Sequence, residues 1–464
     1  MNDYNLLIDG KLVPGALTLP VINPATEEVV THAPRASRGQ LDEAVNAAAE
    51  AFPAWAQTSV DERRDALTAI AKVVTDNSDE LAELITVEQG KPLREARREV
   101  GGTAAFFRYA ATLEIPETTI ADPDRDVVVE QLPLGPVAAI IPWNFPLFTI
   151  AFKLPWALLA GNTVVVKPAP TTPLTTLRFG ELVAPLLPAG VLNIIVDDND
   201  LGDALTSHPA IRKVSFTGST QTGARVMAGA SATVKRLTLE LGGNDCALVL
   251  PDADPEPVAD SIFRAAFTNN GQVCLAIKRV YVHRANYDAF VAALATRAEA
   301  SVVGDGHQET TDLGPVQNAK QYQKLLGLLE SAARDGRIVA GGTAIDGPGY
   351  FLRPTIVADI AEGTEIVDDE QFGPILPVVV YDDLDDAVKR VNNTTFGLGA
   401  SVWSSDVTRA REVARRIDAG TVWVNKHADL APHVPFGGAK LSGVGVEFGQ
   451  QGLLEFTQRR VISS

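Results

Sequence analysis

The chain has 464 residues, of which 46% are hydrophobic and 21% charged, and its formal net charge is -18. This length predicts two or three domains rather than one simple core, and the acidic balance disfavours nucleic acid and anionic membranes as partners. The two cysteines, Cys246 and Cys274, do not make a disulfide scaffold and indicate a reducing compartment. The N-terminus shows no secretory signal, so a cytoplasmic location is expected.

In chain order, residues 40–56 and 60–89 predict amphipathic helices, because apolar residues recur there at helical spacing with charges between them. The stretch 135–161 carries one formally charged residue, Lys153, and is long enough to span a bilayer. Its four prolines cannot all sit in one regular helix. A buried strand at 137–141, an irregular loop and then a helix are expected instead.

Short apolar strands then alternate with helices, which predicts a parallel sheet with helical crossovers, the doubly wound arrangement of nucleotide-binding domains. The strands expected up to residue 241 are 126–133, 137–141, 162–168, 191–196 and 213–218, with helices at 174–187, 201–207 and 220–229. Beyond a domain change near Leu241, the expected strands are 246–251, 279–283 and 421–425, with helices at 255–270 and 286–299. Residues 453–464 are expected to return as an edge strand beside 120–133.

Cys274 is the first candidate catalytic residue. It follows Asn269, Asn270 and Gly271, and these polar turn-formers indicate a loop rather than a core strand. A thiol in such a loop is either an intrinsically strong nucleophile or a buried inert side chain. Cys246 lies within an apolar run, which predicts a core residue.

A cysteine protease and a zinc site are two alternatives for the cysteines. The histidines show no protease signature, so a papain-like Cys–His pair is a weak alternative. The Cys and His spacings show no paired metal-ligand motif, so no metal is expected. The six histidines are His32, His208, His283, His307, His427 and His433.

Two glycine-containing segments add further candidates. In TGSTQTGARV (217–226) a strand leads through Gly218 into a helix, a setting for a phosphate at a helix N-terminus, although an ordinary turn has the same pattern. In LELGGND (239–245) Glu240 precedes two glycines and is able to activate a water if it is partly desolvated; the alternative is a surface glutamate.

Six motifs together resemble the aldehyde dehydrogenase superfamily, in its NAD(P)-dependent hydrolytic form, over nearly the whole chain. The motifs are PWNFP (142–146), FTGS (216–219), ELGGN (240–244), GQVCLA (271–276), EQFGPI (370–375) and PFGGAKLSGVG (435–445). The resemblance implies an α/β fold with a Rossmann-like doubly wound cofactor domain, a second α/β catalytic domain and a small β oligomerisation extension. The corresponding ranges are 1–115 with 135–241, then 242–452, and 116–134 with 453–464.

The resemblance also implies catalytic roles. Cys274 matches the nucleophile that forms a thiohemiacetal and then a thioester, and Glu240 matches the base that activates the hydrolytic water. Asn144 matches the side-chain donor of the oxyanion hole, with the backbone N–H of Cys274 as second donor. Loss of one such donor typically slows a reaction by about 10²–10³. Lys153 matches a lysine near the active site.

A cofactor site for NAD is implied in the same way, with NADP also plausible. Glu370 and Phe372 match residues that hold the nicotinamide ribose and ring, Lys167 matches the lysine at the adenine ribose, and Gly218 and Ser219 match the pyrophosphate turn. The remaining expected contacts are Ile141, Pro142, Trp143, Ala169, Pro170, Gly202, Phe216, Thr217 and Leu241.

The lysine motif departs from the family pattern at one position. Many NAD-preferring members carry Lys-Pro-x-Glu, whose glutamate binds the ribose hydroxyls, whereas this chain reads KPAP with Pro170 in that place. An acidic residue there disfavours a 2′-phosphate by charge repulsion. Its absence predicts that NADP is used as well as NAD, with NAD favoured.

The expected substrate tunnel is apolar and aromatic. No arginine occurs in it, so a dicarboxylic semialdehyde lacks an obvious clamp, and a neutral medium-sized aliphatic or aromatic aldehyde is favoured. The tunnel residues implied by the family positions are Phe145, Phe148, Thr149, Phe152, Val273, Leu275, Leu430, His433 and Phe436.

Three alternatives remain: a semialdehyde dehydrogenase, a CoA-acylating member, and a catalytically silent structural relative. Glu240 argues against CoA acylation, since that reaction can dispense with a water-activating carboxylate. The presence of both Cys274 and Asn144 argues against a silent relative. The expected partners are a small aldehyde and further copies of the chain, as a homodimer or homotetramer.

Overall fold

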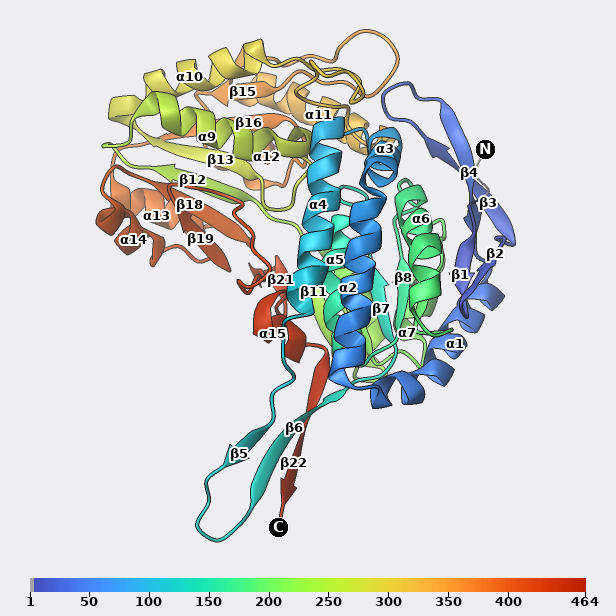
Figure 1. Cartoon of the computed structure of the whole chain (residues 1–464). Coiled ribbons are helices and arrows are strands. Elements are labelled where there is room, and N and C mark those ends of the chain that lie inside the picture. Colours follow the sequence, from blue (N-terminus) through green and yellow to red (C-terminus); the bar gives the residue numbers. More distant parts are fainter. Residues whose placement is uncertain (1–3) are drawn as a thin grey trace.

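The computed structural model describes residues 4–464 as two α/β bodies and a narrow β extension that projects from them (Figure 1). The first body is built on an eight-stranded sheet with the order β2-β1-β9-β8-β7-β10-β11-β21. Its strands are β1 (Leu6–Ile8), β2 (Lys11–Val13), β7 (Val137–Ile140), β8 (Val164–Lys167), β9 (Leu192–Ile194), β10 (Lys213–Thr217), β11 (Arg236–Glu240) and β21 (Gly443–Val444).

The five central strands of this sheet are parallel and run β9-β8-β7-β10-β11. Every residue of β7 and β8 is buried, as expected for apolar strands covered on both faces. The chain enters at β7, proceeds outward to β9, and then crosses to β10 on the other side. A crevice therefore opens between the carboxyl ends of β7 and β10, where ligands bind in doubly wound folds. The Rossmann-like α/β class is confirmed.

Helices of the first body precede the sheet or connect its strands. They are α1 (Arg38–Gln57), α2 (Val60–Asp76), α3 (Ser78–Gln89), α4 (Leu93–Ala110), α5 (Phe148–Leu159), α6 (Leu174–Val183), η1 (Ala184–Leu186), α7 (Gly202–Ser207) and α8 (Thr220–Ser231). The prediction of one helix over 60–89 was wrong, because Asn77 ends α2 and begins α3. The predicted strand, loop and helix of 135–161 are confirmed.

Five elements near the N-terminus were not predicted: β1, β2, β3, β4 and α4. The hairpin of β3 (Leu17–Ile22) and β4 (Val29–Arg35) has several outward-facing apolar residues and so lacks a clean alternation. Helix α4 contains a Gly-Gly pair, Gly101–Gly102, which weakens its local helical signal. Gly102 packs closely against α5, since an added Cβ would lie 3.0 Å from the Phe148 ring.

The second body is built on a seven-stranded sheet with the order β14-β15-β16-β13-β12-β18-β19. Its strands are β12 (Asp245–Val249), β13 (Ile277–His283), β14 (Arg337–Ala340), β15 (Thr355–Ala358), β16 (Ile375–Tyr381), β18 (Gly399–Trp403) and β19 (Thr421–Val424). Its helices are α9 (Pro255–Phe267), η2 (Thr268–Gly271), η3 (Arg284–Asn286), α10 (Tyr287–Ala300), α11 (Ala319–Asp335), α12 (Glu365–Asp368), α13 (Leu384–Asn392) and α14 (Val407–Ala414). A small pair, β17 (Phe396–Gly397) and β20 (Ala439–Lys440), and helix α15 (Gly449–Leu454) lead the chain back to the first body.

The extension is a three-stranded antiparallel sheet with the order β22-β6-β5 (Figure 1). Its strands are β5 (Thr118–Ile120), β6 (Val127–Pro133) and β22 (Thr457–Ser463). The predicted pairing of the C-terminal segment with residues before 134 is confirmed, although β22 begins only at Thr457 because Leu453 and Leu454 end α15. The domain boundaries stay predictions. Across residues 4–464, none of the helices combines the length and apolar character needed to cross a bilayer.

Candidate active site

The crevice between β7 and β10 is a cavity of about 650 Å³. Ten of the expected cofactor residues line it: Ile141, Pro142, Trp143, Lys167, Ala169, Pro170, Phe216, Thr217, Gly218 and Ser219. Gly202, at the start of α7, does not line it. Sequence reasoning missed Ile22, Thr171, Asp198, Asn199, Thr222, Gln317, Asn318, Ala319, Lys320 and Tyr350, which lie on separate loops and elements.

A second cavity of about 200 Å³ continues from the first, since Pro142, Trp143 and the 217–219 turn line both. It reaches the thiol-bearing loop. Its other lining residues are Asn144, Leu241, Gly242, Cys274, Gln321, Lys324, Glu370 and Phe372. The structure thus brings Cys274, Asn144, Leu241, Glu370 and Phe372 together beside the dinucleotide-type crevice.

Cys274 lies in a loop between η2 and β13 and is half-buried. Two preceding residues, Asn269 and Asn270, adopt left-handed backbone conformations with φ of 48° and 57°, which asparagine tolerates better than most residues. Lys278 secures the loop from the other side, since its Nζ donates to the carbonyls of Val273 and Cys274 at 2.7 Å each. The thiol is therefore held on a constrained turn.

The electrostatic surroundings of Cys274 favour the protonated thiol. Burial raises its pKa to about 12, and the negative charges of Glu240, Glu370 and Asp245 act in the same direction, whereas Lys278 opposes them. Nε2 of His427 lies 2.9 Å from the carbonyl oxygen of Leu275 and donates to it, so this ring nitrogen is not available as a base toward Cys274. In the free chain the thiolate is a minor species at neutral pH.

Asn144 lies in the loop after β7 and is buried. Its Nδ2 donates to the carbonyl of Gln272 at 2.8 Å, which leaves the second N–H of the amide for another acceptor. The backbone carbonyl of Asn144 accepts hydrogen bonds from Lys91 Nζ and from Asn269 Nδ2, both at 2.9 Å. Lys91 is in turn paired with Glu99 at 2.6 Å, and both side chains are fully buried. These contacts orient the amide toward the Cys274 loop.

Glu240 ends β11 and is 3% exposed. Burial raises its pKa well above the usual range, the charge of Glu447 raises it further, and Lys153 opposes both. Its carboxylate oxygens are buried without a side-chain hydrogen-bond partner in the described chain, and the backbone N–H of Gly438 acts to lower the pKa. Lys153 Nζ is 2.7 Å from Glu447 Oε1, and both side chains of this pair are buried. A carboxylate in this state is suited to accept a proton near neutral pH.

Glu370 and Phe372 approach the cavity from the second body. Glu370 Oε1 accepts from the backbone N–H of Gly243 at 3.0 Å and lies 3.7 Å from Lys278 Nζ. A Cβ at Gly242 would lie 2.5 Å from the other Glu370 oxygen, so a larger residue there would displace the Glu370 carboxylate. The Phe372 ring meets the Trp143 ring edge to face at 5.3 Å.

At the far end of the larger cavity, Lys167 Nζ is 2.5 Å from Asp197 Oδ1, and both side chains are buried. The second Asp197 oxygen accepts from the backbone N–H of Leu201 at 2.9 Å. Asp198 also lines this cavity; its side chain is 62% exposed and one of its oxygens lies 3.9 Å from Nη1 of Arg35. The positive charge of Lys167 is therefore already balanced by Asp197, and the Asp198 carboxylate adds a further negative charge to this cavity. Sequence reasoning missed both aspartates because they lie in a DDND run that resembles a polar loop.

The expected substrate residues belong to an aromatic cluster beside α5. The Phe148 and Phe152 rings are 4.6 Å apart, Phe145 is 6.5 Å from Phe148, and Phe436 stacks on Phe448 at 5.7 Å. His433 is exposed and lies 6.2 Å from Tyr109, while Val273 and Leu275 are buried on either side of Cys274. Sequence reasoning missed Phe106, Tyr109 and Phe448, which contact these rings from α4 and the loop before α15.

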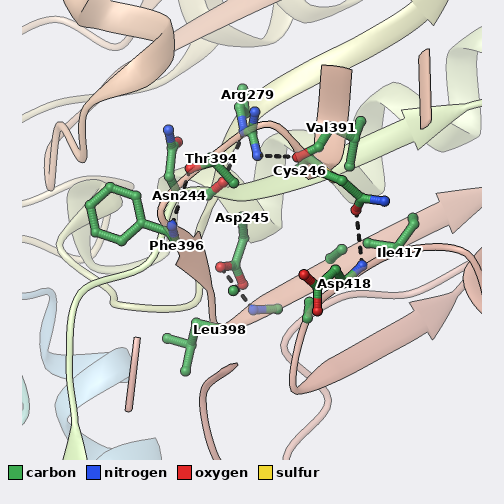
Figure 2. A pocket seen from close by; sticks show the side chains of 15 residues that line it. Asn244, Asp245, Cys246, Arg279, Val391, Thr394, Phe396, Leu398, Ile417 and Asp418 are labelled. Atoms are coloured by element: carbon green, nitrogen blue, oxygen red, sulfur yellow. Dashed lines mark hydrogen bonds between the residues drawn. The ribbon is translucent and has the colours of Figure 1, made fainter. Parts of the chain in front are cut away.

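The other cysteine, Cys246, lines a separate cavity of about 10 Å³ beside β12 and β18 (Figure 2). This volume holds roughly one water molecule. Arg279 closes it by donating to the carbonyls of Asn244 and Val391. Burial raises the pKa of Cys246 to about 11, and the residue is 2% exposed, in agreement with the predicted core role. Within residues 4–464, no cluster of His, Cys, Asp and Glu side chains is arranged to hold a metal ion.

A doubly wound domain, a second α/β body and a cysteine at the inner end of the interstrand crevice define a class of dinucleotide-dependent oxidoreductase folds. The model of the aldehyde dehydrogenase family matches residues 13–462. The chain belongs to the aldehyde dehydrogenase family.

Individual relatives agree with this assignment. Aldehyde dehydrogenase LUC3 of a Fusarium species is 41% identical, with 95% of this chain and 94% of the relative covered. Phenylacetaldehyde dehydrogenase of Pseudomonas fluorescens is 38% identical, with 98% and 95% covered. Among solved structures, betaine aldehyde dehydrogenase of Staphylococcus aureus in complex with NAD⁺ is 32% identical, with a TM-score of 0.97 over 100% of this chain and 94% of that one.

Proposed function

We propose that this protein oxidises a neutral aldehyde to its carboxylic acid with NAD⁺, through a thioester on Cys274. The observation that carries the proposal is the continuous pair of cavities, in which Cys274 and Asn144 lie at the inner end of a crevice built for a dinucleotide. The staphylococcal relative with the same fold binds NAD⁺. The bound nicotinamide supplies a hydride acceptor and a positive charge.

The Cys274 sulfur attacks the aldehyde carbonyl, and the amide of Asn144 stabilises the oxyanion together with the backbone N–H of Cys274. The contact of Asn144 with Gln272 already orients the amide, so little reorganisation is needed when charge develops. Glu370 and Phe372 hold the nicotinamide end beside the thiol. The catalytic roles predicted for these residues are consistent with their placement around one cavity.

After hydride loss the substrate is a thioester on Cys274, and Glu240 activates the water that hydrolyses it. Its raised pKa makes Glu240 a stronger base than an exposed glutamate. Lys153 and Glu447 act behind it, because their charges shift its pKa in opposite directions. The need for Glu240 favours hydrolysis over transfer to CoA, and the free acid is the expected product.

The cofactor preference follows from the aspartates at the adenine end. Pro170 removes the family's glutamate, but Asp198 places a carboxylate on the same cavity wall, and Asp197 neutralises Lys167. Lys167 is already paired with Asp197, so a 2′-phosphate at this end of the cavity would add negative charge near Asp198. We therefore propose a clear preference for NAD, a narrower expectation than the dual use suggested by Pro170 alone.

Replacing Asp198 with asparagine is expected to strengthen NADPH binding roughly five- to tenfold, because one partly exposed charge is worth about 1 kcal/mol. NADH binding should weaken or stay unchanged. Fluorescence titration of both reduced cofactors measures the effect without turnover. Asp203→Asn is the matched control, since Asp203 is exposed on α7 and does not line the cavity. Equal affinities of the wild type for both cofactors would contradict the proposal.

The substrate is proposed from the aromatic cluster around Phe145, Phe148, Phe152 and Phe436, which offers apolar rings and no arginine. The phenylacetaldehyde dehydrogenase relative is consistent with this chemistry.

In a panel of phenylacetaldehyde, benzaldehyde, hexanal, betaine aldehyde and succinate semialdehyde, kcat/KM should be highest for one of the neutral aldehydes. A neutral group matches an apolar wall without leaving a charge unpaired. Initial rates of NADH formation give the ranking. A large preference for succinate semialdehyde would contradict the proposal and favour a semialdehyde dehydrogenase.

We further propose that copies of the chain associate through the β extension. Ile120, Val461 and Ile462 are exposed there, and β5 and β22 are its edge strands. Exposed apolar side chains on open strand edges are typical of surfaces that pair. The choice between homodimer and homotetramer, and the cytoplasmic location, rest on the sequence expectations.

A further inference from the structure

Three charged side chains at the N-terminal end of α4 contact both chain segments that carry the donors of the oxyanion hole. Glu95 and Glu99 lie one turn apart on α4, and Lys91 lies just before the helix begins. Lys91 Nζ is 2.6 Å from Glu99 Oε2, and both of these side chains are 0% exposed. Lys91, Glu95 and Glu99 are here called the α4 clamp.

Lys91 holds the backbone of the residue whose amide is the first donor. Its Nζ donates to the backbone carbonyl of Asn144 at 2.9 Å and lies 3.7 Å from the centre of the Phe145 ring. An ammonium group has three N–H bonds. The Glu99 carboxylate, the Asn144 carbonyl and the face of the Phe145 ring provide one acceptor for each of them. The Asn144 backbone is therefore attached to a fully buried and fully paired charge.

Glu99 holds the other end of the same segment. Leu147 is the N-cap residue of α5, and its side chain makes no cap hydrogen bond. Glu99 Oε1 accepts from the backbone N–H groups of Leu147 and Phe148, at 3.0 and 3.1 Å. This carboxylate satisfies N–H groups that have no partner within the helix, and its charge interacts favourably with the positive end of the helix dipole. Lys91 and Glu99 together thus hold segment 144–148 at both of its ends.

Glu95 contacts the segment that carries the second donor. Its Oε2 accepts from the backbone N–H of Asn269 at 3.1 Å, in the turn that leads to Cys274. Asn269 Nδ2 donates to the backbone carbonyl of Asn144 at 2.9 Å, so the two donor segments are also joined directly. The backbone N–H of Cys274 is the second donor in the proposed mechanism. One helix end therefore contacts the segments of both donors.

We propose that the three clamp residues are positioning residues, which keep the Asn144 amide and the Cys274 N–H at the spacing that one oxyanion requires. The proposal rests on the proposed function. None of the three side chains lines either site cavity, so the clamp acts through the two donor segments and not on the substrate. Donors that are held in place need no reorganisation when charge develops. A misplacement of about 1 Å is enough to slow a reaction by about 10²-fold.

Two clamp variants test the two donor segments separately. Glu95→Ala removes the acceptor of the Asn269 N–H, and kcat/KM for the aldehyde should fall about ten- to hundredfold while NADH binding is retained. Glu95→Gln should restore most of the rate, because its amide oxygen still accepts from that N–H. The paired variant Lys91→Met with Glu99→Gln removes the ammonium without leaving a buried charge unpaired, and a similar fall is expected.

Two reactions without cofactor separate the oxyanion from the thiol. Acetyl transfer from p-nitrophenyl acetate to Cys274 forms an S–C bond through an oxyanion, releases p-nitrophenolate and gives the thiol proton to solvent. Alkylation of Cys274 by iodoacetamide displaces iodide at a saturated carbon and forms no oxyanion. In Glu95→Ala and in the paired variant, acetyl transfer should slow by about the same factor as aldehyde oxidation, whereas alkylation should stay within about twofold of the wild type.

A double-mutant cycle with Asn144→Ala tests whether Lys91 and Glu99 act through the first donor. The paired variant should lose much less acetyl-transfer rate in the Asn144→Ala background than in the wild type, because the donor that it positions is already absent. Arg390→Met with Glu362→Gln is the matched control, since this partly buried ion pair of the second body lines neither site cavity. The control should lower Tm and leave acetyl transfer within about twofold.

Unchanged acetyl transfer in Glu95→Ala would overturn the proposal, as would equal losses of the paired variant with and without the Asn144 amide. Equal falls in acetyl transfer and alkylation would also overturn it, because the thiol itself would then be displaced. The two Glu95 variants decide the matter if the paired variant does not fold. Failure of the proposed function is distinguishable, since the wild type would then form no NADH from aldehyde while its acetyl transfer still depends on the clamp.

Discussion

Cys274→Ala is expected to lower kcat for aldehyde oxidation by about 10⁴-fold or more, as removal of a covalent nucleophile does in other acyl-transfer enzymes. The half-buried sulfur lines the inner cavity and is the group placed to attack a carbonyl next to Asn144. Without it neither the thioester nor the preceding tetrahedral adduct forms. Steady-state NADH formation and the pre-steady-state burst should both disappear, while NADH binding is retained.

Cys246→Ala is the matched control for this variant. Cys246 lies on β12 in the core and lines neither site cavity, so its loss should change stability and leave kcat within about twofold. Intact turnover in Cys274→Ala would contradict the whole covalent mechanism. Loss of activity in both variants together with a loss of folding, measured by circular dichroism, would assign the effect to structure instead.

Glu240→Gln is expected to separate the two halves of the reaction. The thiol still attacks and hydride is still lost, so one equivalent of NADH per active site should form in a burst. Hydrolysis then stalls, and kcat should fall by about 10²–10⁴. Intact-protein mass spectrometry should detect the acyl group on Cys274.

The pH dependence supplies a second test of Glu240. Its pKa is raised well above the usual glutamate range by burial and by Glu447. Because the base acts when deprotonated, wild-type kcat should rise with pH through that elevated value, and the rise should be absent in Glu240→Gln. A wild type that turns over only when CoA is added would contradict the hydrolytic mechanism, as would a Glu240→Gln variant with undiminished kcat.

The site residues found from sequence share one property: they lie in short motifs with glycine, proline or asparagine at turns. Cys274, Asn144 and Glu370 are of this kind, and the structure gathers them around one cavity. Lys278, Asp197 and Lys213 do not lie in such motifs, so the sequence did not single them out. A lysine or aspartate in a strand or polar loop does not reveal its partner, since that partner is distant in the chain.

The fold was predictable where one physical rule dominated. Buried parallel strands such as β7 and β8 are continuous apolar runs, so both were expected close to their observed bounds. The break between α2 and α3 was not predicted, because a single residue, Asn77, interrupts a sequence pattern that is amphipathic on both sides of it. Element boundaries depend on capping contacts that periodicity does not contain.

By itself, the sequence determined the family, the α/β class and the residues that turn-forming motifs carry, because backbone conformation and apolar periodicity are local properties. Only the tertiary structure decided which charges meet. It balanced Lys167 with Asp197, placed Asp198 on the wall of the larger cavity, and brought Lys213 within 3.7 Å of Glu455. Proton affinity and cofactor choice depend on burial and on charges brought together from distant segments, so they follow from the folded chain.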